Sequence, residues 1–311
     1  MAKKIILCFG GTWNKPESNT NVIKIYKSIL GEDRSPKSVG VPVPTAVEPA
    51  IKWYDRGVGT HRWNKVPGGL TGRGLARNIL EGYKFLVGNY ESGDEIYLFG
   101  FSRGAYTARS LAGLIRNIGI LHKENAPEAD IEDNPILMKG FWIYQRRGPE
   151  ADTEEALFFR SKYSIDGVEI KFVGVWDTVG AMGIPSTDLD RVDQRYEFHD
   201  TGLSKIVNNA YHALSIDETR PEFIPTLWTS KPKLGQRVEQ VWFAGVHSEV
   251  GGGKKPSLTD DPLRWMQDKA QENGLELDPK QIASIDKKEF INARVTNHFN
   301  WLSLNYYPIW A

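Results

Sequence analysis

Short apolar runs alternate along the chain with segments whose apolar residues recur every three or four positions. The runs cover residues 4–9, 51–54, 95–101, 169–176 and 238–246, lengths typical of strands buried on both faces. Helical spacing covers 20–30, 75–90, 103–118 and 260–273. This alternation predicts an α/β fold with a doubly wound, mostly parallel sheet. Right-handed crossovers favour the order 2-1-3-4-5 for the predicted strands, which places the ends of strands one, three, four and five side by side.

Two long segments interrupt this alternation. Residues 121–165 predict helices and irregular chain, and residues 181–237 predict loops and helices, including a periodic helical stretch at 203–214 that carries His212. We therefore expect one domain over 1–311, in which both segments are cap-like insertions that roof a pocket. Trp142 and Trp228 are candidates for the pocket lining and equally for the core, and His212 is expected to be a supporting or core residue.

The strand at 95–101 and the helix after it are joined by a G-x-S-x-G pattern, Gly100-Phe101-Ser102-Arg103-Gly104. A nucleophile elbow requires this context, because the strained turn presents the serine hydroxyl above the sheet. Gly100 and Gly104 are expected to be small because a β-carbon there would clash. The backbone N–H groups of Arg103 and of Gly11 or Thr12, which follow the first strand, are then candidate oxyanion donors. The competing interpretation is a glycine-rich turn whose serine caps the helix.

Two further candidate side chains follow predicted strands at the same edge of the sheet. Asp177 comes directly after the strand at 169–176, and His247 directly after the strand at 238–246. A carboxylate orients an imidazole, and an imidazole that titrates near neutrality can take a serine proton. The chain order of serine, acid and histidine is that of α/β-hydrolases. Alternatively, Asp177 caps the next turn and His247 is structural.

Composition limits the classes of partner. The 311 residues carry 39 Lys and Arg against 39 Asp and Glu, so bulk electrostatics implies no nucleic-acid or anionic-membrane surface. The single cysteine, Cys8, lies in an apolar run and excludes a disulfide within the chain. The apolar run at 5–9 is too short for a signal peptide, and no run reaches transmembrane length. We expect a cytoplasmic protein, with export by a signal-independent secretion system compatible with this sequence.

Five motifs follow one another in order along the chain: Thr12-Trp13-Asn14, Gly57-Val58-Gly59-Thr60, Gly100 to Arg109, Gly174 to Val179 and Phe243 to Gly253. Together they resemble a known family, the uncharacterised α/β-hydrolase domain family that includes the catalytic domain of type VI secretion phospholipase effectors. The resemblance extends from the first predicted strand to about residue 273. It implies that Ser102 is the nucleophile, Asp177 the acid and His247 the base of an ester hydrolase that needs no metal or organic cofactor. For the effectors of this family the substrates are phospholipids.

The chain departs from the family pattern in three places. Gly10 stands where the family usually has aspartate, and Glu249 stands in the usual His-Ser-Asp motif. The chain also lacks the long extra region by which the effectors are thought to engage membranes. We therefore expect a small-molecule or lipid ester as substrate. A catalytically impaired hydrolase-fold binding or scaffold module, and an esterase acting on dispersed acyl esters, are the alternatives. The aromatic stretch at 299–310 is either a site of peripheral membrane contact or a structural arm.

Overall fold

Seven strands of the computed structural model form one sheet in the order β2-β3-β1-β4-β7-β8-β9. The structure describes residues 2–11, 18–36, 49–55, 57, 72–125, 133–146, 152–180, 202–253 and 259–283, and every statement below concerns these. Each neighbouring pair in the sheet is parallel. The strands are β1 (Lys4–Phe9), β2 (Glu32–Asp33), β3 (Ala50–Asp55), β4 (Glu95–Phe101), β7 (Ile170–Trp176), β8 (Val207–Ser215) and β9 (Arg237–Phe243).

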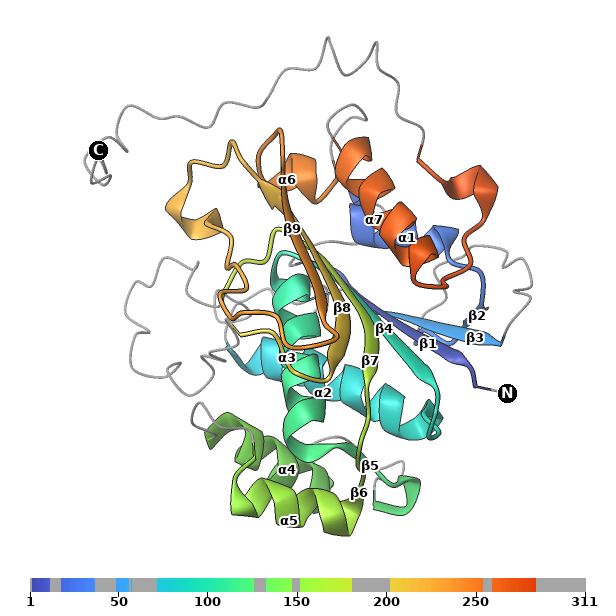
Figure 1. Cartoon of the computed structure of the whole chain (residues 1–311), viewed down its shortest axis with the longest axis vertical. Coiled ribbons are helices and arrows are strands. Elements are labelled where there is room, and N and C mark those ends of the chain that lie inside the picture. Colours follow the sequence, from blue (N-terminus) through green and yellow to red (C-terminus); the bar gives the residue numbers. More distant parts are fainter. Residues whose placement is uncertain are drawn as a thin grey trace.

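Helices cover both faces of this sheet (Figure 1). One face packs against α2 (Gly72–Asn89) and α3 (Arg103–Ile118), and the other against α1 (Asn21–Ser28) and α7 (Asp260–Glu272). The expected doubly wound α/β fold of the hydrolase type is therefore confirmed. The remaining elements are β5 (Ile120–Leu121), η3 (Lys123–Asn125), α4 (Pro135–Arg146), α5 (Glu154–Tyr163), β6 (Ser164–Ile165), η6 (Pro221–Phe223), α6 (His247–Val250) and η7 (Pro279–Gln281).

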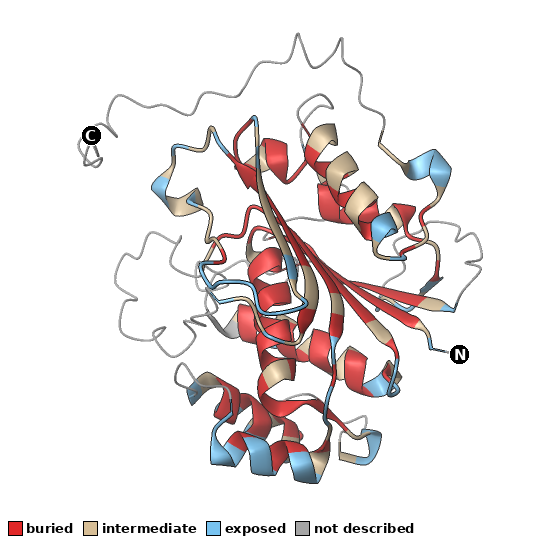
Figure 2. Ribbon diagram, in the orientation of Figure 1, coloured by how far each residue is buried: buried red, intermediate tan, exposed pale blue. Residues whose placement is uncertain are grey.

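The central strands are buried on both faces (Figure 2). All six residues of β1 are buried, and so are six of the seven residues of β4. Side chains of alternate strand residues enter two separate apolar clusters: Ile5, Leu7 and Phe9 belong to the α2–α3 side, whereas Ile6 and Cys8 belong to the α1–α7 side. Because both faces of the sheet exclude water, the sequences of these strands are continuous apolar runs and do not alternate between apolar and polar residues.

The helix predicted at residues 203–214 is wrong, because most of this stretch is the strand β8. It pairs with β7 on one side and β9 on the other, so the strands predicted as fourth and fifth are not neighbours. The polar residues that broke its apolar pattern are satisfied by distant partners. Asn209 donates to the Lys171 carbonyl oxygen (3.0 Å), and the fully buried His212 contacts Thr178 and Gln240. Long-range pairing has overridden the local helical spacing.

The described part of the insertion expected at 121–165 lies away from Ser102. Helices α4 and α5 pack at the C-terminal end of α3, where Arg160 donates to the carbonyl oxygens of Arg116 (3.1 Å) and Asn117 (3.3 Å). Ser102 precedes the other end of this 16-residue helix, about 24 Å away. Trp142 on α4 is 45% exposed, with the Arg146 guanidinium 4.3 Å from its ring centroid, and it lines no site near the serine. The second insertion lies partly outside the described residues, at 181–201.

Candidate active site

Ser102 occupies a tight turn between β4 and α3. Its backbone has φ 57° and ψ −122°, a conformation that residues other than glycine rarely adopt. Its N–H donates to the carbonyl oxygen of Trp176 (3.1 Å), and its own carbonyl oxygen accepts from Tyr106 N–H (3.2 Å). The strained residue is therefore held both by its helix and by the end of the neighbouring strand β7.

The glycines on either side of Ser102 permit close backbone packing. A β-carbon on Gly104 would lie 2.1 Å from the Phe9 carbonyl oxygen, and one on Gly100 would lie 2.4 Å from the Gly104 carbonyl oxygen. Both distances are far inside van der Waals contact, and the atoms met are backbone atoms that cannot easily move. The start of α3 thus rests directly on the end of β1, next to Gly10 and Gly11.

Asp177 follows β7 with a buried carboxylate and a positive φ of 42°. Its N–H donates to the Ala213 carbonyl oxygen on β8 (2.8 Å). Its Oδ1 accepts the N–H of Ser215 (2.9 Å), and the Ser215 hydroxyl lies 2.9 Å from both carboxylate oxygens. These contacts from β8 fix the carboxylate, and its Oδ2 lies 2.5 Å from Nδ1 of His247.

His247 is the first residue of α6 and is 5% exposed. A carboxylate can only accept, so the contact with Asp177 places the imidazole proton on Nδ1 and leaves the Nε2 lone pair available. The imidazole contacts the ring of Phe101 (centroids 4.6 Å apart) and the ring of Phe223 (4.8 Å). Since Phe101 immediately precedes Ser102, the histidine ring is packed against the serine's own strand.

Ser102, Asp177 and His247 thus lie at one edge of the sheet, at the ends of β4, β7 and the segment after β9. In the described part of the chain the hydrogen-bond network joins His247 to Asp177 and does not extend to the Ser102 hydroxyl. A nucleophile–base hydrogen bond is often long in the absence of substrate and shortens when substrate binds. The arrangement is chemically that of a buried acid–base pair at the same edge of the sheet as a serine hydroxyl.

Gly10 and Gly11, which follow β1, lie beside the start of α3. Gly57 packs on them so closely that a β-carbon there would lie 2.4 Å from the Gly11 carbonyl oxygen and 2.6 Å from that of Gly10. Gly11 is buried, Arg103 is the first residue of α3, and Thr12 lies outside the described residues. Both described donor candidates therefore lie next to the Ser102 turn.

A carboxyl group is present beside this loop although Gly10 has none. Asp55, the last residue of β3, accepts Gly57 N–H (3.1 Å), and its carbonyl oxygen accepts Gly10 N–H (2.8 Å). Burial raises the pKa of Asp55 to about 7, against the opposing effect of the Gly57 hydrogen bond. Glu249, the other departure from the family pattern, accepts Val246 N–H (2.9 Å) and so stabilises the start of α6.

Sequence reasoning missed the residues that support the acid and the base. Ser215 directly follows the stretch assigned to a helix and is the last residue of β8, and Glu218 and Phe223 lie in the segment after it. Glu218 accepts the N–H of His247 (3.1 Å). His212, expected as a supporting or core residue, is buried, and its Nε2 accepts Thr178 N–H (3.1 Å). Burial, with a smaller effect of the Arg109 charge, lowers the His212 pKa to about 3 and keeps the ring neutral.

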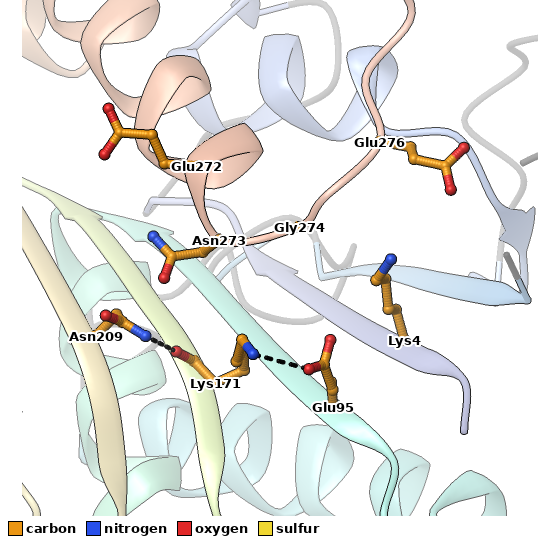
Figure 3. Close-up of a pocket in the computed structure, with 8 residues that line it drawn as sticks. All are labelled: Lys4, Glu95, Lys171, Asn209, Glu272, Asn273, Gly274 and Glu276. Carbon is orange, nitrogen blue, oxygen red and sulfur yellow. Dashed lines mark hydrogen bonds and ion pairs between the residues drawn. The ribbon is translucent and has the colours of Figure 1, made fainter. Parts of the chain in front are cut away.

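A surface cavity of about 650 Å³ lies at the opposite edge of the sheet, where β1, β4 and β7 begin (Figure 3). Its charged side chains already have partners: Lys171 bonds Glu95 (2.9 Å), and Glu272 bonds Lys269 (3.2 Å). The cavity is thus remote from Ser102 and offers no unpaired charge on those residues. Its lining consists of Lys4, Glu95, Lys171, Asn209, Glu272, Asn273, Gly274 and Glu276.

Within the described ranges, no three His, Cys, Asp or Glu side chains are grouped so that they could hold a metal ion. None of the helices in those ranges combines the length and apolar character needed to cross a bilayer.

Comparison with known proteins decides the family. The model of the type VI secretion phospholipase effector Tle1-like catalytic domain matches residues 3–269. The chain belongs to this family. The doubly wound, parallel sheet of the chain agrees with membership of this family.

Three individual proteins that are similar to this Tle1-like domain share 16–30% sequence identity with it. An uncharacterised protein of Saccharomyces cerevisiae is 30% identical over 258 residues, which are 75% of this chain and 33% of the yeast protein. The chain therefore spans about a third of that relative. An uncharacterised protein from Pseudomonas aeruginosa aligns with 93% of this chain and 48% of its own at 16% identity and a TM-score of 0.49. The Tle1 effector bound to the VgrG spike aligns with 85% and 53%, at 18% identity and a TM-score of 0.39.

Proposed function

We propose that the protein is a serine hydrolase that cleaves carboxylic esters through an acyl-enzyme. Ser102 is the nucleophile, His247 the general base and Asp177 the residue that orients the imidazole. The observation that carries the proposal is the 2.5 Å contact between the buried Asp177 carboxylate and Nδ1 of His247, adjacent to a serine in a strained strand-to-helix turn. Family membership supports the same reaction class.

The reaction has two halves. In the first, Nε2 of His247 takes the Ser102 proton, the hydroxyl oxygen attacks the ester carbonyl carbon, and the alcohol leaves with the proton returned by His247. In the second, His247 takes a proton from water, which attacks the acyl carbon, and then returns that proton to the Ser102 oxygen as the carboxylic acid leaves. Asp177 keeps the imidazole in the required tautomer and stabilises the transient imidazolium.

The tetrahedral intermediate carries a negative charge on the former carbonyl oxygen. We assign its donors to the backbone N–H of Arg103, at the start of α3, and to that of Gly11 or Thr12 in the loop after β1. A donor of this kind is typically worth about 3 kcal/mol in the transition state. The positive end of the α3 dipole adds to this stabilisation because Ser102 immediately precedes the helix.

The substrate class we propose is an acyl ester. We include lipid and phospholipid acyl esters among the candidate substrates because the family is named for phospholipase effectors. Dispersed short or medium acyl esters are the preferred form, because a chain with no net charge has no general attraction to an anionic bilayer. The aromatic stretch at 299–310, a candidate for membrane contact, lies outside the described residues.

The direct test is hydrolysis of p-nitrophenyl esters of graded acyl length by the parent and by Ser102→Ala. We expect turnover to be abolished while the far-ultraviolet circular dichroism and the free energy of unfolding stay close to those of the parent. Ser161→Ala, which changes an exposed serine on α5, is the matched control and should keep full activity. Residual activity of Ser102→Ala within tenfold of the parent would place the nucleophile elsewhere. An inactive parent would favour a binding or scaffold module.

A further inference from the structure

The segment from Asp217 to Phe223, which follows β8, is bonded to the loop that carries His247. Asp217 N–H donates to the Gly245 carbonyl oxygen (3.2 Å), and Gly245 N–H donates to Oδ2 of Asp217 (2.7 Å). One residue further along, the Glu218 carboxylate accepts the N–H of His247 itself (3.1 Å). The main chain around the histidine is therefore held by a segment of the chain that is distant from it in sequence.

The same segment also contacts the histidine ring. Phe223 places its ring centroid 4.8 Å from that of His247 at an interplanar angle of 48°. Aromatic rings attract one another at centroid separations of about 4.5–7 Å, and tilted arrangements are favourable. With Phe101 on the ring as well, at 4.6 Å and 33°, the imidazole contacts two aromatic neighbours. Rotation of the imidazole about its side-chain bonds would break both contacts.

Phe223 is in turn fixed by an ion pair. The Arg220 guanidinium lies 4.0 Å from the Phe223 ring centroid, and its Nε and Nη2 donate to the two carboxylate oxygens of Glu218 at 2.8 and 2.7 Å. The Glu218 side chain is 0% exposed. Burial alone would raise its pKa, but hydrogen bonds from Arg220 and His247 and the Arg220 charge lower the pKa to about 2. The carboxylate is thus charged throughout the neutral range.

We propose that Glu218, Arg220 and Phe223 are positioning residues for the base of the proposed hydrolase. Glu218 fixes the main chain of His247, Arg220 connects Glu218 to Phe223, and Phe223 fixes the imidazole so that it keeps its hydrogen bond to Asp177 beside Ser102. This inference rests on the proposed function, since it assigns the segment a role in the rate and not only in folding. The contacts form a closed path that begins and ends at His247.

The first experiment measures kcat and KM for Phe223→Leu, Phe223→Tyr and the control Phe158→Leu. Phe158 is an exposed ring on α5, 62% accessible, so it matches the chemical change at a remote place. We expect Phe223→Leu to lower kcat by about three- to tenfold with KM unchanged, the range that the loss of one aromatic contact predicts. Phe223→Tyr should keep kcat near the parent value because it retains the aromatic ring, and Phe158→Leu should also match the parent.

A second experiment tests whether the path acts as a unit. Glu218→Gln keeps a side-chain oxygen for His247 N–H but removes the charge that holds Arg220, whereas the control Glu155→Gln makes the same chemical change at an exposed carboxylate on the remote helix α5. We expect the first to lower kcat by about three- to tenfold and the second to leave it unchanged. The double variant with Phe223→Leu should lose less than the product of the two single losses, because both changes release the same ring. A loss equal to the product would overturn the proposed connection.

A readout independent of turnover is the nuclear magnetic resonance of the carbon-bound protons of the His247 ring, assigned by comparison with His247→Gln. Ring currents of Phe101 and Phe223 should displace these signals in the parent, and Phe223→Leu should move them toward ordinary imidazole values. A displaced signal that moves while kcat stays at the parent value overturns the positioning role and leaves the hydrolase intact. A parent with displaced signals but neither ester hydrolysis nor modification at Ser102 overturns the proposed function, and the positioning role with it.

Discussion

Two buried serines should respond in opposite directions to the same substitution. Ser215 on β8 is 3% exposed, and its hydroxyl lies 2.9 Å from both oxygens of the Asp177 carboxylate. Ser110 on α3 is 0% exposed, and its hydroxyl has no hydrogen-bond partner among the described residues. Replacing either by alanine removes one buried oxygen and almost no volume. The contrast therefore isolates what the carboxylate contact contributes.

The magnitudes follow from the two environments. A hydrogen bond to a charged group contributes about 1.5–3 kcal/mol, so Ser215→Ala should lower the free energy of unfolding by that amount. For Ser110→Ala the change removes an unsatisfied buried group, and alanine is the better helix former by about 0.5 kcal/mol. We expect the second variant to be more stable than the parent by about 0.5–2 kcal/mol. The two variants should thus differ by about 2–5 kcal/mol.

Urea denaturation followed by tryptophan fluorescence measures both values, and the ten tryptophans provide the signal. The dependence of the free energy on urea concentration should be the same in all three proteins if only stability has changed. Ester hydrolysis should fall in Ser215→Ala, because the carboxylate loses a fixing contact, and should stay at the parent rate in Ser110→Ala. Equal destabilisation by both substitutions, or a Ser215→Ala effect below about 0.5 kcal/mol, would refute the reasoning.

Three other changes have defined outcomes. Asp177→Asn should lower kcat about 10⁴-fold by favouring the wrong imidazole tautomer, and His247→Ala should be comparably damaging; a nearly neutral Asp177→Asn would place the acid elsewhere. Because burial raises the pKa of Asp55 to about 7, the folded protein retains a proton there that the unfolded chain releases above about pH 4. The contribution of Asp55 to stability therefore falls as pH rises through this window. The stability of Asp55→Asn relative to the parent should accordingly grow by a few kcal/mol between about pH 4 and 7, and a constant difference in urea unfolding would contradict this. Finally, dispersed p-nitrophenyl esters should be hydrolysed faster than zwitterionic or anionic phospholipid vesicles. A sharp rise in rate at the lipid surface, lost on replacement of the aromatic residues at 299–310, would contradict that preference.

The local apolar pattern of the sequence predicted those strands and helices whose apolar positions follow directly from how they pack. The runs at β1, β4 and β7 are apolar because both faces of the central sheet are covered, and the periodicity of α2, α3 and α7 follows from their packing on one side. The order of the strands from β3 to β7 followed from right-handed crossovers. Because parallel strands end at one edge, the sequence also placed Ser102, Asp177 and His247 in the same region, and the structure describes them there.

The strand β8 could not be recognised from its own residues. Leu203, Ile206, Val207, Ala210 and Leu214 recur at helical spacing, and a strand buried on both faces shows no alternation that would correct this impression. What makes the stretch a strand is pairing with β7 and β9 and the partners found by Asn209 and His212. These contacts join residues that are 38 and 34 positions apart in the chain, so the sequence near β8 carries no sign of them.

The supporting residues of the candidate site were missed for the same reason. Ser215 lies at the end of the unrecognised strand, and Glu218 and Phe223 lie in the segment after it. Nothing in the sequence around them indicates that they meet His247, whose loop follows a different strand. The chemistry-bearing residues have recognisable motifs, whereas the residues that orient them are defined only by the fold.

The most direct test of the central claim is covalent labelling of the purified full chain with a fluorophosphonate probe, followed by peptide mapping by mass spectrometry. The account predicts one adduct, on the Ser102 hydroxyl, which forms much more slowly in His247→Ala and is absent in Ser102→Ala although both variants fold. An adduct on another residue, or no adduct on a parent protein shown to be folded, would contradict the assignment of Ser102 as an activated nucleophile.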